Sequence, residues 1–182
     1  MGANEKIRQV DPAALQVLRY PDPRLRAVCV PVDKVNGDVK RLIERMFDLM
    51  FADRGVGLAA PQVGVPVRLF IASPDFNPED RRVYINPRII AVDGTQEEDE
   101  GCLSFPGITC KIKRSNEVTI RAIGLDGREF QETGTELAAR VFQHEMDHLE
   151  GWLLVDRMGS VARLANRRSL KELEDKFADS KA

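Results

Sequence analysis

One predicted helix constrains the fold of this 182-residue chain more than any other segment. It runs from Thr135, a suitable N-cap, to Gly151, a suitable left-handed C-terminal residue, and it is apolar in its first half. Its second half contains His144-Glu145-Met146-Asp147-His148, and the chain has no histidines beyond these two. Residues four apart share a helix face, so both imidazoles and the Glu145 carboxylate form one polar group. We expect this helix to cross the core and carry that group inward.

The HExxH pattern of this helix favours a metal site. Two imidazoles one turn apart can hold a divalent ion, and the carboxylate between them can take a proton from water. Burying such a cluster without a metal would be costly. The alternative is an exposed, charge-rich helix surface, which is common for so short a pattern.

A catalytic metal site of this kind needs a third protein ligand. Metzincins carry a histidine where this chain has Leu154, so that class is excluded. A thermolysin-like enzyme would use Glu172 or Glu174, which lie in a stretch typical of a solvated helix. Cys102 is the remaining candidate, because a thiolate is a strong ligand for zinc or ferrous iron. By itself, however, a cysteine beside a glycine is more often simply buried.

A third segment, residues 55–64, contains glycines that permit close approach of the backbone to a ligand. Gln62 adds a neutral donor and acceptor. The segment matches no phosphate-binding motif, and taken alone it predicts only a tight turn after a helix.

The pattern of apolar and turn-forming residues in the rest of the chain predicts an α+β fold. A helix is expected after Asp38, its predicted N-cap, and an amphipathic helix over about 160–177. The first 35 residues, rich in proline, predict extended segments and turns. The run 97–99 is expected to be a solvated loop, and Asp126-Gly127 a hairpin turn. Short β-branched runs predict strands at 67–72, 82–85, 89–92, 108–112 and 118–123. The order of helix, strands, helix and helix favours α+β over a parallel βαβ layout.

Composition further narrows the class of protein to which this chain can belong. Apolar residues make up 43% and the net charge is −2, which argues against a disordered chain and gives no strong nucleic-acid signal. The apolar runs are too short to span a membrane. Three cysteines without a disulfide spacing favour a reducing compartment, with Cys29 and Cys110 as core residues. We expect one domain over 1–182, with a core at about 7–158 and a helical tail at about 159–182. The expected location is the bacterial cytoplasm, or an organelle for a mature organellar form.

Three segments in this order together resemble the peptide deformylase family, which is marked by GxGLAAxQ, EGCLS and QHExDHLxG. The matching segments are residues 55–62, 100–104 and 143–151, with no motif position broken. Residues 21–26 and 85–87 also resemble the family, so the likeness covers most of 7–158. The resemblance implies an α+β fold with antiparallel or mixed sheets around a central HExxH helix. It also implies removal of the formyl group from the N-terminal formyl-methionine of newly made polypeptides, with release of formate.

The resemblance implies catalytic roles for individual residues. Three side chains would hold one metal ion: Cys102, His144 and His148. Glu145 would be the acid and base. The Gln62 side-chain amide and the Leu103 backbone N–H would stabilise the oxyanion.

The resemblance also implies how the substrate lies. The backbones of Gly57 and Glu100, which flank the cleft, would align the peptide. The methionine pocket is expected to be apolar, although Arg140 stands on the wall where an apolar residue would be expected. Its predicted lining residues are Val56, Leu137 and Val141.

A thiolate ligand favours Fe²⁺ in the cell, with Zn²⁺, Ni²⁺ or Co²⁺ also able to occupy the site. The implied partners are N-formyl-methionyl nascent peptides at the ribosome exit. Two alternatives stay open. One is another HExxH metallopeptidase that depends on Glu172 or Glu174. The other is a non-catalytic deformylase-like peptide-binding module, against which the intact Glu145 and Gln62 argue.

Overall fold

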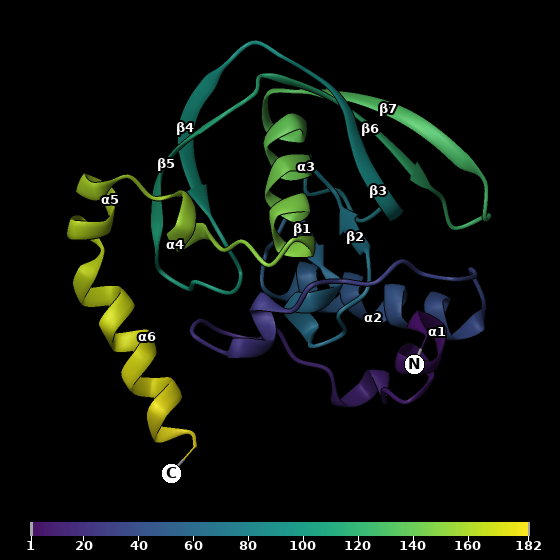
Figure 1. Cartoon of the computed structure of the whole chain (residues 1–182), viewed down its shortest axis with the longest axis horizontal. Coiled ribbons are helices and arrows are strands. Elements are labelled where there is room, and N and C mark those ends of the chain that lie inside the picture. Colours follow the sequence, from purple (N-terminus) through teal and green to yellow (C-terminus); the bar gives the residue numbers. More distant parts are fainter. Residues whose placement is uncertain (1, 182) are drawn as a thin grey trace.

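The computed structural model describes residues 2–181 and confirms the α+β prediction. Figure 1 shows α3 (Glu136–Leu149) at the centre, with a large sheet on one side and a two-stranded hairpin on the other. The hairpin and the large sheet therefore meet the same helix from two directions. This arrangement places the HExxH pattern inside the molecule.

The large sheet is antiparallel and has five strands in the order β1-β2-β3-β6-β7. Its strands are β1 (Gly57–Ala59), β2 (Leu69–Ala72), β3 (Arg82–Asp93), β6 (Glu117–Ile123) and β7 (Glu129–Thr135). The expected turn at Asp126-Gly127 joins β6 to β7, with Gly127 at a φ of 81°. The two runs predicted at 82–85 and 89–92 are one strand, β3. Pro87 interrupts the pattern there, and the pairing with β6 shifts register between Ile85 and Arg88, across this proline, and again between Ile89 and Ala91.

The second sheet is the hairpin of β4 (Gln96–Gly101) and β5 (Thr109–Arg114). The prediction of a solvated loop at 97–99 is wrong, because these residues pair with β5 in continuous register. Glu97 lies opposite Lys113, and Asp99 lies opposite Lys111. Both faces of this part of β4 are exposed, so the strand shows no apolar alternation to reveal it.

Helix α2 (Gly37–Ala52) buries an apolar stripe of residues at helical spacing, among them Val39, Leu42 and Met46, against β1 and β2. Its N-cap is Asn36, whose side chain accepts a hydrogen bond from the Val39 N–H at 3.0 Å, so the prediction of Asp38 is wrong. Asp38 lies in the first turn, where a negative charge is also favourable. The preceding residues, from Gly2 on, form no long helix, as predicted, and are mainly extended or in turns. They include one short helix, α1 (Ala3–Arg8), and two 3₁₀ turns, η1 (Pro12–Ala14) and η2 (Pro23–Arg26).

The predicted limits of α3 are confirmed: Thr135 is its N-cap, and Gly151 follows it at a φ of 77°. The apolar first half packs on the large sheet. Phe142 lies 5.2 Å from Tyr84 and 6.5 Å from Phe70 between ring centroids. Because this face is anchored in the core, the second half holds its polar side chains in fixed positions.

The tail contains α4 (Leu154–Arg157), α5 (Ser160–Ala165) and α6 (Arg167–Asp179). The single helix expected over 160–177 is divided at Asn166. Figure 1 shows α6 extending away from the sheets toward the C-terminus, and within it only Leu170 and Leu173 are buried. In the span 2–181, no helix combines the length and the apolar character that crossing a membrane requires.

Candidate active site

Three potential metal ligands converge beneath a cleft. His144 and His148 project from α3, and Cys102 follows β4 directly. The His148 Nε2 atom lies 3.2 Å from His144 Nε2 and 3.3 Å from Cys102 Sγ. All three donor atoms lie within 4.8 Å of one another. Two imidazole nitrogens and one thiol around a common point fit a zinc- or iron-type ion with an open fourth position.

The two imidazoles are prepared for this role in different ways. His144 Nδ1 lies 2.7 Å from Glu100 Oε1, which turns its Nε2 toward His148. Burial lowers the pKa of His144, but Cys102 and Glu100 outweigh burial and raise it well above its usual range, so a metal would displace a proton from this ring. Burial, together with the neighbouring His144, lowers the pKa of His148 well below its usual range. A neutral ring is the form that binds metal.

The Glu100 carboxylate is held by more than His144. Arg114 donates to both of its oxygens, at 3.2 Å and 2.6 Å. Burial alone would raise the pKa of Glu100, but hydrogen bonds from His144 and Arg114 outweigh it and lower the pKa to about 2. Glu100 is therefore ionised at neutral pH. Arg114 also donates to Asp147 at 2.7 Å, and Asp147 accepts from Arg157.

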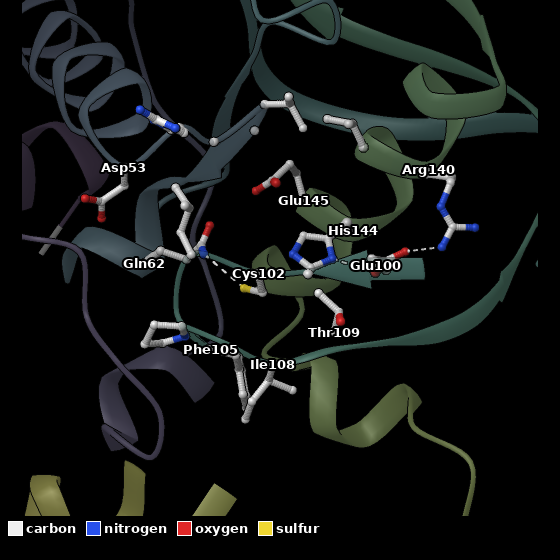
Figure 2. Close-up of a pocket in the computed structure, with 18 of the residues that line it drawn as sticks. Asp53, Gln62, Glu100, Cys102, Phe105, Ile108, Thr109, Arg140, His144 and Glu145 are labelled. Carbon is white, nitrogen blue, oxygen red and sulfur yellow. Dashed lines mark hydrogen bonds and ion pairs between the residues drawn. The ribbon is translucent and has the colours of Figure 1, made fainter. Parts of the chain in front are cut away.

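Arg140 does not place its charge in the expected methionine pocket. Its side chain is buried and lines the cleft, but its guanidinium turns away to Glu100, as Figure 2 shows. It donates to Glu100 Oε2 at 2.9 Å and to the carbonyls of Glu98 and Ile112 at 3.0 Å and 3.1 Å. The residue thus ties α3 to the β4–β5 hairpin, and it presents no free charge to the cleft.

Glu145 lies beside the three ligands and is 3% exposed. In the part of the chain that the structure describes, its Oε2 has no hydrogen-bond partner. Burial raises its pKa to about 7. The lack of a side chain at Gly57 leaves room for Glu145, because a Cβ at Gly57 would overlap Glu145 Oε1 and lie 3.0 Å from Val141 Cγ1. The carboxylate is therefore free to exchange protons near neutral pH.

Gln62 is held in one orientation in the 3₁₀ turn η3 (Ala60–Val63). Its Oε1 accepts from the Ala59 N–H at 2.8 Å, and its Nε2 donates to Ser104 Oγ at 3.1 Å. The same Nε2 lies 3.5 Å from Cys102 Sγ, so it faces the convergence point of the ligands. Leu103, which follows Cys102, packs against Gly55 and lines the same cleft.

The cleft has a volume of about 580 Å³. All the residues predicted to contact substrate line it: Val56, Gly57, Glu100, Leu137 and Val141. Phe105 and Ile108, which the sequence did not single out, add apolar surface below Cys102 (Figure 2). Glu172 and Glu174, considered as ligands, belong to α6 instead. There Glu172 pairs with Arg168, and Glu174 accepts from the Tyr20 hydroxyl at 3.1 Å.

Sequence reasoning missed the interactions of Arg114, Arg140 and Asp147. Their partners lie 10 to 42 positions away along the chain. No local spacing of residues predicts such contacts. For Glu100, the sequence suggested only a backbone role. Its place two residues before Cys102 was the one available signal that its side chain reaches the same site.

Comparisons with known proteins agree with this geometry. A family model described as polypeptide deformylase matches residues 14–164. A peptide deformylase of Acidobacterium capsulatum is 42% identical over 160 residues, which cover 87% of this chain and 94% of that protein.

Solved structures are similar as well. Arabidopsis thaliana peptide deformylase 1B in complex with an inhibitor gives a TM-score of 0.86 at 40% identity, covering 91% of this chain and 93% of the other. A peptide deformylase from Legionella pneumophila gives 0.83 at 39% identity, covering 90% and 96%. The chain therefore belongs to the peptide deformylase family, whose members are metal-dependent enzymes that remove the formyl group from newly made polypeptides.

Proposed function

We propose that this chain hydrolyses N-terminal formyl-methionine to formate and a free amino terminus at the cleft above Cys102, His144 and His148. The observation that carries the proposal is the convergence of these three donor atoms beside Glu145, whose Oε2 has no hydrogen-bond partner within residues 2–181. A divalent ion held by them would supply Lewis acidity, which activates water for attack at neutral pH.

Glu145 is the proposed acid and base. With a pKa of about 7, it can accept a proton from the attacking water and return it to the leaving amine. The water oxygen bonds to the formyl carbon, and the bond from that carbon to the methionine nitrogen breaks. The nitrogen leaves as an amine with the proton from Glu145.

Gln62 and Leu103 are the proposed oxyanion donors. The Gln62 amide is already fixed by Ala59 and Ser104, so it needs no reorganisation as charge develops on the formyl oxygen. The Leu103 backbone N–H would be the second donor. One such donor is typically worth about 3–4 kcal/mol in the transition state.

The substrate is proposed to lie between two backbones, those of Gly57 and Glu100. The methionine side chain would contact Val56, Leu137 and Val141. Because the Arg140 guanidinium is occupied by Glu100 and two carbonyls, only its stem can contribute to this wall.

The thiolate in the donor set supports Fe²⁺ as the cellular metal, with Zn²⁺, Ni²⁺ or Co²⁺ as replacements. We further propose that the substrates are nascent polypeptides at the ribosome exit. The proposed location is the bacterial cytoplasm, or an organelle for an organellar form. Residues 1–182 would act as one catalytic domain with a helical tail.

Formate release from a formyl-Met tripeptide tests the proposal, with protein prepared without oxygen and loaded with Fe²⁺ or Ni²⁺. We expect rapid release, with acetyl-Met and unblocked tripeptides untouched. Cleavage of the unblocked peptide would indicate a peptidase. No release from folded, metal-loaded protein would support a binding module.

Two variants test the assigned roles. Glu145→Gln should retain the metal but lose turnover by several orders of magnitude. Cys102→Ser should lose metal on dialysis, as measured by elemental analysis. A serine variant that retains metal as well as the wild type would exclude the thiolate as a ligand.

A further inference from the structure

The end of α2 places an arginine where a glycine would be expected. Asp53 is the C-cap of the helix, and Arg54 follows it at a φ of 57°. The Arg54 N–H bonds to the Phe51 carbonyl at 3.1 Å, and the Gly55 N–H bonds to the Met50 carbonyl at 2.8 Å. These two bonds form a Schellman motif, whose left-handed position is usually glycine because a Cβ there is unfavourable.

Arg54 lies on the rim of the cleft. Its side chain is exposed and lines the cavity together with Arg19 and Asp53. Arg19 is already engaged, since it donates to the Leu103 carbonyl and pairs with Asp53 at 2.9 Å. Within residues 2–181, Arg54 forms no side-chain hydrogen bond or ion pair. The rim therefore carries one uncommitted positive charge.

The other charges around the cleft do not neutralise it. Figure 2 shows Asp53 on one side of the cavity and Glu100 with Arg140 on the other. Glu100 is neutralised by Arg114 and Arg140, both buried beside it. Asp99 also lines the cleft, but it lies on β4 next to Glu100 and not at the end of α2. At the end of α2, Arg19 and Asp53 neutralise each other, so a peptide that leaves the cleft there meets the unpaired charge of Arg54.

We propose that Arg54 selects formyl-methionyl peptides that carry an acidic side chain at one of the first two residues after methionine. This rests on the proposed function, which places methionine against Val56. Arg54 and Val56 line the same cleft, and two extended peptide residues reach about 7 Å beyond methionine. A guanidinium recognises a carboxylate by paired, charge-assisted hydrogen bonds.

The test compares kcat/KM for formyl-Met peptides that carry Asp, Asn or Lys at the first residue after methionine, and then at the second. For wild-type protein we expect Asp to exceed Lys by about three- to tenfold at one of these positions, the range for an exposed ion pair and its repulsive counterpart. The preference should shrink in high salt, because exposed charges are screened.

Three variants and one control assign the preference to Arg54. Arg54→Glu should reverse it, Arg54→Lys should retain most of it, and Arg54→Gly should abolish it while relieving the left-handed backbone. Arg128→Gln, a control at an 87% exposed arginine in the turn after β6, should change nothing.

The outcomes separate this proposal from the underlying function. Turnover of the neutral Asn peptides reports on deformylation alone and should be similar in all Arg54 variants. Equal kcat/KM for Asp and Lys at both positions in the wild type would overturn the proposal. So would an acidic preference that persists in Arg54→Gly, which would leave Arg54 as a helix-end residue only.

Discussion

Replacing Arg140 by methionine removes a buried cation while keeping an unbranched side chain. The Arg140 side chain is 6% exposed and donates three hydrogen bonds. In the variant, Glu100 keeps Arg114 but loses its second arginine, and the buried Ile112 carbonyl loses a donor. Removing one partner of a buried ion pair typically costs about 3–5 kcal/mol. Because Arg114 remains, we expect a loss near the lower limit, about 3 kcal/mol in the free energy of unfolding.

The measurement is urea unfolding of metal-free protein at neutral pH. Arg157→Met is the matched control, because Arg157 also pairs with a carboxylate of this network but its side chain is 41% exposed. That variant should lose less than about 1 kcal/mol. A second measurement, the rate of metal transfer to a chelator, should be faster in Arg140→Met, since Glu100 would orient His144 less firmly.

The alternative is that Arg140 acts mainly as a wall of the methionine pocket. Methionine would then make that wall more apolar, lower KM for formyl-Met peptides and leave stability almost unchanged. A loss no larger than that of Arg157→Met, together with a lower KM, would refute the structural role assigned to Arg140.

Three further predictions concern the cleft and the start of α3. Burial raises the pKa of Glu145 from 4.5 to about 7, so in metal-free protein this group favours folding below its unfolded pKa and loses that contribution as pH rises through about 7. In urea unfolding, the free energy of unfolding of Glu145→Gln relative to the wild type should therefore rise by about 2–3 kcal/mol between about pH 5 and about pH 8. A difference that does not change with pH would contradict the raised pKa. Gly57→Ala would place a Cβ against Glu145 and Val141, so kcat should fall about hundredfold with an unchanged circular dichroism spectrum; near-normal kcat would show that Glu145 tolerates displacement. Glu136 begins α3 at a φ of 50°, so Glu136→Gly should raise stability by about 1 kcal/mol in thermal unfolding, and a lower Tm would mean that its side chain stabilises the helix start.

The sequence predicted those features whose signals are local. The α2 stripe and the limits of α3 follow from helical periodicity and end residues, and both are confirmed. The strand β4 was missed, because exposure on both of its faces removes the period-two signal. The single strand β3 was divided in two because Pro87 lacks the N–H that a regular ladder needs.

The candidate site likewise combines features that local sequence patterns predict with features that they do not. His144, Glu145 and His148 lie within one turn and a half of a helix, so their spacing alone brings them together. The contacts of Arg140 could not be read in this way. Its partners belong to the hairpin, and their approach depends on how the hairpin docks on α3. An arginine among apolar neighbours on a helix therefore suggested a pocket wall, whereas tertiary packing supplied it with a carboxylate.

The register of the β4–β5 hairpin places Cys102 in the metal site and also orients His144 through Glu100. Glu100 and Cys102 are two residues apart, and Glu100 pairs with Cys110 across the hairpin. Successive side chains of a strand point to opposite faces, so a shift of one residue would turn Glu100 away from His144 and displace Cys102 as well. Arg114 and Arg140 oppose such a shift, because both pair with Glu100 in its present position and a buried carboxylate without partners is costly. The buried charges thus do more than add stability: they fix the one register in which the thiol and the two imidazoles can meet.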